Sequence, residues 1–198
     1  MTAVLAVDIG GTTFAAAVVR ADRSIVDRAE VPVGADPTAT LAALVGRFDL
    51  TGVRGVGVGS AGPVHLDLGA VSPVNIPAWR RFPITAVLAD LTGGRPVALA
   101  GDAQCMALGE HWHGHAPSLL GVVVSTGVGG GLVLDGEPYL GRTGNAGHIG
   151  HIAVGAPPGR VRVRGERRQR PRHGPVGARA RLDRRHRRAG PRRRRRPR

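Results

Sequence analysis

Two glycine-rich stretches and one isolated aspartate could carry phosphate chemistry. The first stretch joins the carboxylate of Asp8 to Gly10, Gly11 and two hydroxyls, Thr12 and Thr13. Glycines let backbone N–H groups approach an anion, the hydroxyls add donors, and the carboxylate can hold Mg²⁺ beside the phosphates. Taken alone, the stretch also fits an ordinary glycine hairpin with a solvated aspartate.

The second glycine-rich stretch follows about 115 residues later and also bears a hydroxyl. It runs from Thr126 through Gly127, Gly129 and Gly130 to Gly131. Two such turns on either side of a further carboxylate suggest two half-domains that clamp a nucleotide triphosphate. Neither turn is a P-loop, because the chain has no lysine, and neither leads into a helix as a dinucleotide fingerprint does.

The isolated carboxylate is Asp102, at the end of one predicted strand and the start of a predicted helix. It could cap the helix or serve as a general base. Apolar runs predict the strands that hold the two turns: strands at 4–7 and 14–19 form one hairpin, and a buried strand at 119–125 pairs with 132–134 to form the other. The other expected elements are a strand at 24–33, a helix opened by Asp36 and Pro37, a strand at 53–59 with a turn at 60–63, an irregular segment at 71–79, a helix at 84–91 and a strand at 96–100.

The composition divides the chain. Residues 1–155 hold 9 arginines and 12 acidic residues, whereas residues 156–198 hold 19 arginines and 2 acidic residues, so the net charge of +14 comes from the tail. A single cysteine, Cys105, excludes an internal disulfide, and we expect it to be a small buried thiol in a helix. No run is long enough to span a membrane and no leader precedes the first strand, so we expect a cytoplasmic protein.

Six motifs occur in the order found in ROK-family sugar kinases, and the chain resembles the bacterial glucokinases of that family over residues 3–154. The motifs are Asp8-x-Gly-Gly-Thr12, Gly59-x-x-Gly-Pro63, Pro73-x-Asn-x-Pro-x-Trp79, Asp102-Ala103 with Ala107-Leu-Gly-Glu110, Thr126-Gly-Val-Gly-Gly-Gly131 and Gly147-x-x-Gly-His151. The resemblance implies an α/β fold of the actin/hexokinase-like (ribonuclease-H-like) ATPase type, an N-terminal domain plus an incomplete second domain, with a hexose, most simply glucose, in the cleft beside ATP and Mg²⁺. It also implies a homodimer in the intact family.

The resemblance assigns roles to individual residues. Asp102 would be the catalytic base for ATP-dependent phosphorylation of a hexose hydroxyl. The other assignments are ATP and Mg²⁺ binding by Asp8, Gly10, Gly11, Thr12, Thr13, Thr126, Gly127, Gly129 and Gly130, and sugar binding by Gly62, Asn75, Asp102, His148 and His151. His151 would also be a ligand of the structural zinc that the family carries, but its cysteine partners are absent.

Two departures from the family put the identity of the sugar in question. The family's Asn-Asp-Ala-Asn reads Gly101-Asp-Ala-Gln104 here, which removes a sugar-binding amide, and the family's Glu-x-Gly-His begins with His148. Histidines at 111, 113 and 115 could suggest a metal site, but a polar connection between a helix and a strand is the favoured interpretation.

We expect three parts: an N-terminal α/β domain at 1–100, the start of a second α/β domain at 101–155, and a disordered arginine-rich tail at 156–198. The tail could bind nucleic acid non-specifically through phosphates. Our preferred hypothesis is that the reading frame slips between about Gly150 and Val161, because a one-base shift of Val161-Arg-Val-Arg-Gly165 can encode the Cys-x-Cys-Gly of a zinc knuckle. The kinase would then be truncated, which could abolish its activity.

A ROK-type transcriptional regulator, which senses a sugar without phosphorylating it, is the alternative function. Such a regulator would carry a winged-helix domain before the first hairpin. The sequence begins three residues before Val4 and keeps Asp102, which favours the kinase.

Overall fold

The computed structural model describes residues 2–152 except 115, 125 and 126, and only the backbone of His151. The predictions for Thr126 and for the tail therefore lie outside the described residues. The elements are β1 (Ala3–Ile9), β2 (Thr13–Arg20), β3 (Ile25–Pro32), α1 (Pro37–Val45), β4 (Val53–Ser60), β5 (Val64–His65), a 3₁₀ turn (Leu66–Leu68), β6 (Ala70–Val71), α2 (Ile84–Leu91), β7 (Val97–Gly101), α3 (Asp102–Trp112), β8 (Leu119–Val124), β9 (Val128–Leu134), β10 (Glu137–Pro138) and a 3₁₀ turn (Ile149–His151).

A five-stranded sheet in the order β3-β2-β1-β4-β7 is built from the N-terminal part of the described chain. The strands β1, β2 and β3 are antiparallel neighbours, which confirms the predicted hairpin and meander. The strands β4 and β7 run parallel to β1. The carboxyl ends of three strands therefore meet at one edge, where open α/β sheets bind ligands.

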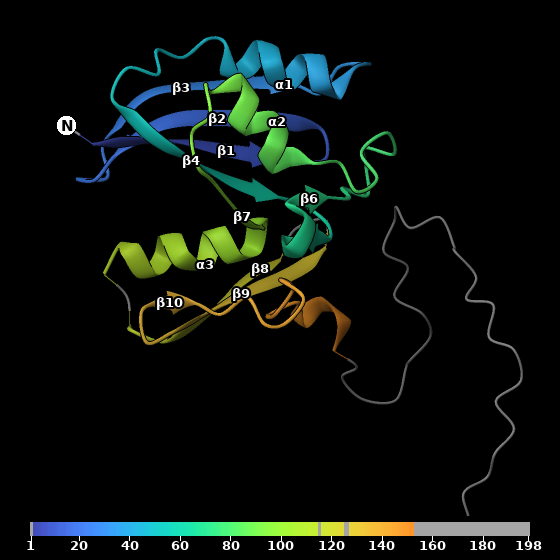
Figure 1. Ribbon diagram of the computed structural model, residues 1–198. Coiled ribbons are helices and arrows are strands. Elements are labelled where there is room, and N and C mark those ends of the chain that lie inside the picture. Colours follow the sequence, from blue (N-terminus) through green and yellow to red (C-terminus); the bar gives the residue numbers. More distant parts are fainter. Residues whose placement is uncertain (1, 115, 125–126, 153–198) are drawn as a thin grey trace, which may run out of the picture. The chain divides into compact units, whose positions relative to one another are not determined.

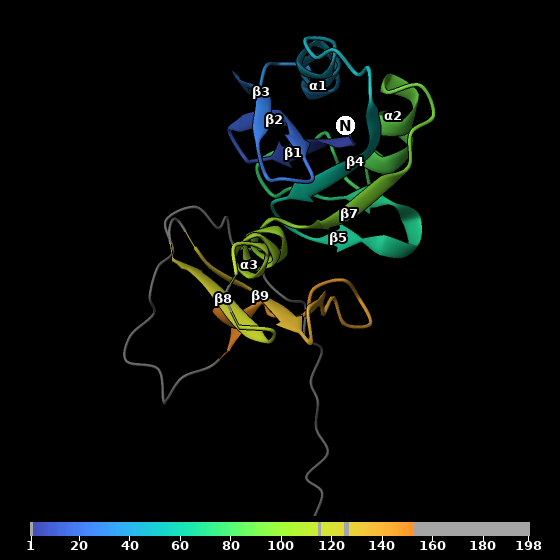
Figure 2. The same ribbon diagram turned by 90° about the vertical axis from the view of Figure 1, so that its left-hand side faces the viewer.

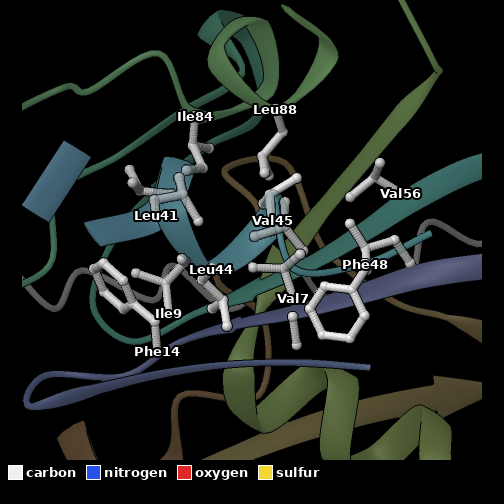
Figure 3. Close-up of a cluster of buried hydrophobic side chains, with 14 of the residues drawn as sticks. Val7, Ile9, Phe14, Leu41, Leu44, Val45, Phe48, Val56, Ile84 and Leu88 are labelled. Carbon is white, nitrogen blue, oxygen red and sulfur yellow. The ribbon is translucent and has the colours of Figure 1, made fainter. Parts of the chain in front are cut away.

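The core lies between this sheet and the helices α1 and α2, which cover one of its faces (Figure 1). Successive residues of a strand point to opposite faces, so Leu5, Val7 and Ile9 are buried while Val4 and Asp8 are exposed on the other face. Figure 3 shows Val7, Ile9 and Phe14 of the hairpin packed under the α1 leucines Leu41 and Leu44. Burial of this apolar face stabilises the hairpin within the sheet.

The helix α3 packs on a second, three-stranded sheet with the order β10-β9-β8 (Figures 1 and 2). The strand predicted at 119–125 is present as β8, but the prediction that it is buried is wrong, because Leu120 is 50% exposed, Val122 49% and Val124 75%. Only one face of β8 meets α3, and no other described element covers its opposite face. Apolar periodicity predicted the strand correctly but could not say what packs on it.

Three local predictions also need correction. The second glycine run does not form only a turn: Gly129, Gly130 and Gly131 lie within β9. The helix α3 continues through His111 to Trp112, so the polar connection is shorter than expected. The segment expected to be irregular begins with β6, which pairs with β5. Among the described residues, no helix is both long and apolar enough to cross a bilayer.

Candidate active site

Strand register brings the two predicted functional carboxylates to the same face of the sheet. Asp8 lies opposite Gly59 of β4, and Gly59 lies opposite Ala100 of β7. Asp102 is the first residue after β7, and it opens to the same side as Asp8. Parallel pairing of distant segments thus places together two carboxylates that are 94 residues apart in the sequence.

Asp8 and Asp102 both line a pocket of about 610 Å³ between the open face of the sheet and α3. Most of the lining is apolar and small, including Ala6, Ala98 and Ala100. The Asp8 carboxylate opens into this pocket, where water reaches it but the walls partly desolvate it. Burial, followed by the charges of Asp102 and Glu30, raises the pKa of Asp8 above its ordinary value of 3.8.

Asp102 is the first residue of α3, and Gly101 occupies the cap position. The alternative role of Asp102 as the helix cap is therefore wrong. Its Oδ1 accepts a hydrogen bond from the Ala103 N–H at 2.7 Å, and its side chain is exposed to the pocket. A carboxylate that opens into a pocket can accept a proton from a hydroxyl bound there within hydrogen-bond reach.

The turn after β1 uses some of its polar groups internally. The Gly10 N–H donates to the Thr13 carbonyl at 3.1 Å, and the Thr12 carbonyl accepts from the Val33 N–H at 2.9 Å. The Gly10 N–H is therefore engaged within the hairpin. The Thr12 side chain is exposed and Thr13 is half-buried.

A loop that carries Asn75 closes over this turn. The Asn75 Nδ2 lies so close to Gly11 that any β-carbon at Gly11 would clash with it. Both residues line a second pocket, of about 400 Å³. The tertiary structure therefore brings the predicted sugar-binding amide directly onto the predicted phosphate turn.

Trp79 fixes the position of the Asn75 loop. Its ring is 2% exposed and stacks between Phe14, with centroids 5.3 Å apart, and Phe82, at 4.2 Å. Its Nε1 donates to Thr38 Oγ1 of α1 at 3.2 Å. The Asn75 loop is thus attached to both the hairpin and α1, although nothing in its own sequence indicated which elements it would contact.

The turn at 60–63 lies at the carboxyl end of β4, as predicted. The Ala61 N–H donates to the Ile9 carbonyl at 3.0 Å, and the Ser72 N–H donates to the Pro63 carbonyl at 3.0 Å. Gly62 has a φ of 81° and lies against the backbone of residues 72–74. Gly62 therefore belongs to the same edge of the sheet as Asp8 and the Asn75 loop.

The second glycine-rich stretch divides between a turn and a strand. Gly127 is exposed, Gly129 is half-buried and Gly130 is buried against the backbone of Gly147. His148 follows Gly147 directly and is exposed, while the side chain of His151 lies outside the described residues. The glycines of β9 thus contact the segment that carries the two predicted sugar-binding histidines.

The sequence indicated nothing of the role of Gln104 and was wrong about Cys105. Gln104 is 4% exposed, and its amide bridges Gly101 and Ala146. The position of Gln104 three residues after a helix cap was the available signal. Cys105 is exposed rather than buried, because it borders the pocket beside Asp8 and Asp102. Desolvation by the pocket walls and these two charges raise its thiol pKa to about 11.

The donor sets fit the two expected metals differently. Asp8 and Asp102 present hard oxygen ligands toward one pocket, which suits Mg²⁺ held with phosphate and water. Among the described residues no three histidine, cysteine or acidic side chains cluster as a metal site. The side chain of His151 lies outside the described residues, and the sequence holds no cysteine after Cys105 that could join it as a zinc ligand.

Comparisons with known proteins agree with the motifs. The chain is 37% identical over 156 residues to the N-acetyl-D-glucosamine kinase of Erwinia tasmaniensis, which covers 74% of this chain and 51% of that protein. It is 36% identical over 157 residues to the glucokinase of Pyrobaculum calidifontis, covering 78% and 51%. The chain thus spans about half the length of these curated relatives.

A solved structure of a ROK family glucokinase from Streptomyces griseus, in complex with glucose and AMPPNP, matches the fold. The TM-score is 0.67 at 31% identity, with 77% of this chain and 51% of that chain covered. The fold is the actin/hexokinase-like α/β fold that the motifs predicted. The ROK family model matches residues 4–178, which is most of the sequence, and the chain belongs to the ROK family.

Proposed function

We propose that the chain carries the substrate-binding half of an ATP-dependent hexose kinase, with Asp102 as the catalytic base. The observation that supports this most strongly is that Asp8 and Asp102 open into one pocket at the carboxyl ends of β1 and β7. The Erwinia and Pyrobaculum relatives are named as kinases of N-acetylglucosamine and glucose. Glucose is the substrate that we propose first, and N-acetylglucosamine is the natural comparison.

In the proposed reaction Asp102 accepts the proton of the hexose hydroxyl while that oxygen attacks the γ-phosphorus of ATP. The bond from the γ-phosphorus to the bridging oxygen breaks, and ADP leaves. Asp8 and residues 10–13 would hold the phosphates from one side and residues 126–130 from the other. Mg²⁺, when bound, would neutralise phosphate charge, which supplies much of the catalysis in phosphoryl transfer.

The sugar would be held by Gly62, Asn75, His148 and His151. The contact of Asn75 with Gly11 supports this assignment, because it puts a hydrogen-bonding amide beside the phosphate turn. His148 stands where the family has a carboxylate, and it would change the hydrogen bonding to one sugar hydroxyl. A reaction that consumes ATP also fits the cytoplasmic location expected from the sequence.

The test measures ADP formation by the whole chain with ATP, Mg²⁺ and either glucose or N-acetylglucosamine. We expect hexose-dependent ADP formation that falls by about 100-fold or more in Asp102→Asn, because general-base catalysis contributes that much. Asp90→Asn, on the exposed side of α2, is the matched control and should retain activity. Hexose binding detected by calorimetry without ADP formation would favour the regulator. The absence of both hexose binding and ADP formation would refute the proposal.

A further inference from the structure

Gln104 is a buried polar side chain whose two ends are both used. Its Oε1 accepts a hydrogen bond from the Gly101 N–H at 3.1 Å, and its Nε2 donates to the Ala146 carbonyl at 3.1 Å. In the reverse orientation of the amide, its NH₂ group would face the Gly101 N–H, donor against donor, and its oxygen would face the Ala146 carbonyl, acceptor against acceptor. Only one orientation therefore satisfies both contacts.

The two partners of Gln104, Gly101 and Ala146, lie 45 residues apart in the sequence. Gly101 directly precedes Asp102, the proposed base. Ala146 directly precedes the segment 147–151, which carries His148 and His151. One side chain thus connects the start of α3 to the segment that is proposed to hold the sugar from the opposite side.

The surroundings leave little freedom for this connection. A β-carbon on Gly131 would lie 2.5 Å from the Ala103 carbonyl oxygen, and one on Gly130 would lie 2.6 Å from the Gly147 carbonyl oxygen. The backbones of α3, β9 and residue 147 are therefore packed without side chains between them. The Gln104 side chain spans the distance between the Gly101 N–H and the Ala146 carbonyl, which the packing of these backbones fixes.

We propose that Gln104 is a positioning residue of the hexose subsite, which holds the segment 147–151 at a fixed distance from Asp102. This inference rests on the proposed function. A helix cap alone would need only the contact to Gly101, since a glutamine or glutamate three residues after the cap serves that purpose. The second hydrogen bond, to Ala146, is the one that a cap does not require.

Two variants separate these roles. In Gln104→Glu the carboxylate still accepts from the Gly101 N–H but cannot donate to the Ala146 carbonyl, and glutamate is favourable in the first turn of a helix. In Gln104→Met the volume is retained and both hydrogen bonds are lost without adding charge. Both variants can be made in the whole chain.

We expect Gln104→Glu to raise the hexose KM by roughly 10-fold, the equivalent of one lost hydrogen bond, with the ATP KM nearly unchanged. Its melting temperature should fall, because the new carboxylate is buried and faces the Ala146 carbonyl oxygen. Gln104→Met should raise the hexose KM similarly and also lower the melting temperature. In both variants, backbone amides at 144–150 should exchange with solvent roughly 10-fold faster, while those of β1 and β2 should not change.

Unchanged hexose KM and unchanged exchange at 144–150 in Gln104→Glu would reduce Gln104 to a helix cap and overturn the proposal. If the unaltered chain neither binds nor phosphorylates glucose or N-acetylglucosamine, the proposed function fails, and with it the assignment of a hexose subsite. The exchange measurement needs no sugar, so the connection between α3 and residues 147–151 is judged separately in that case.

Discussion

Asn75 lies directly against Gly11, so the loop after β6 and the turn after β1 meet where no side chain fits between them. The two residues are 64 positions apart in the sequence. This contact joins the segment proposed to bind the sugar to the segment proposed to bind the phosphates. The absence of a side chain at Gly11 therefore admits the Asn75 amide, in addition to the phosphate-binding role that we propose for this glycine.

Gly11→Ala should displace the exposed Asn75 side chain and lower the free energy of unfolding by about 1 kcal/mol, since a flexible side chain can move aside. The hexose KM should rise as well. Gly57→Ala is the matched control, because a β-carbon on Gly57 meets no atom within 4 Å. Its free energy of unfolding should stay within about 0.5 kcal/mol of the unaltered chain. Urea unfolding followed by circular dichroism measures both; equal effects would contradict the Asn75 contact.

Trp79 should be a major contributor to stability, because it is buried between Phe14 and Phe82. Trp79→Ala is expected to lower the free energy of unfolding, measured in urea, by about 3–5 kcal/mol.

Thr38→Val tests the hydrogen bond of Trp79 alone. It leaves the buried Trp79 N–H without its acceptor and should lower the free energy of unfolding by about 1 kcal/mol. Thr2→Val is the control, because Thr2 is exposed, and its free energy of unfolding should not change. Thr40 is not used for this purpose, because its hydroxyl also forms hydrogen bonds. A Thr38→Val protein as stable as the unaltered chain would argue against the hydrogen bond.

Asp8 should make the folded protein less stable as the pH rises. Burial, Asp102 and Glu30 raise its pKa above 3.8, so the native state binds this proton more tightly than the unfolded chain does. Stability from this group is complete below pH 3.8 and is lost as the pH rises through the native pKa. Asp8→Asn should therefore raise the melting temperature at pH 7, and the gain should disappear below pH 3.8.

Asp49 provides the opposite case as a control. Hydrogen bonds from the Thr51 side chain and backbone lower the pKa of Asp49, so its contribution to stability is present above 3.8 and is lost as the pH falls through the native pKa. Asp49→Asn should then lower the melting temperature at pH 7. Thermal unfolding between pH 3 and pH 8 compares the two variants; the same sign in both would show that their carboxylates do not differ as described.

The Cys105 thiol should alkylate slowly in the folded protein. Its pKa of about 11, against an ordinary 9.0, leaves roughly 100-fold less thiolate at pH 8. The iodoacetamide rate should keep rising up to about pH 11 in the folded chain but level off near pH 9 in urea. Asp102→Asn removes the second cause of the shift and should increase the folded rate at pH 8. A folded rate that levels off near pH 9 would contradict this environment.

Local sequence patterns were sufficient for most elements. The strand β1 with its turn, the opening of α1 at Asp36 and the helix α2 at 84–91 follow from periodicity and capping over fewer than a dozen residues. The motif order was enough to recognise the family. These features depend on neighbours in the chain, which the sequence displays directly.

The contacts that build the site depend on residues distant in the sequence. Parallel pairing of β1, β4 and β7 decided that Asp8 and Asp102 share a pocket, and packing decided that Asn75 meets Gly11. The exposed face of β8 and the exposed Cys105 were predicted wrongly for the same reason. The apolar pattern of a segment shows which residues avoid water, whereas only the tertiary structure decides which surface covers them.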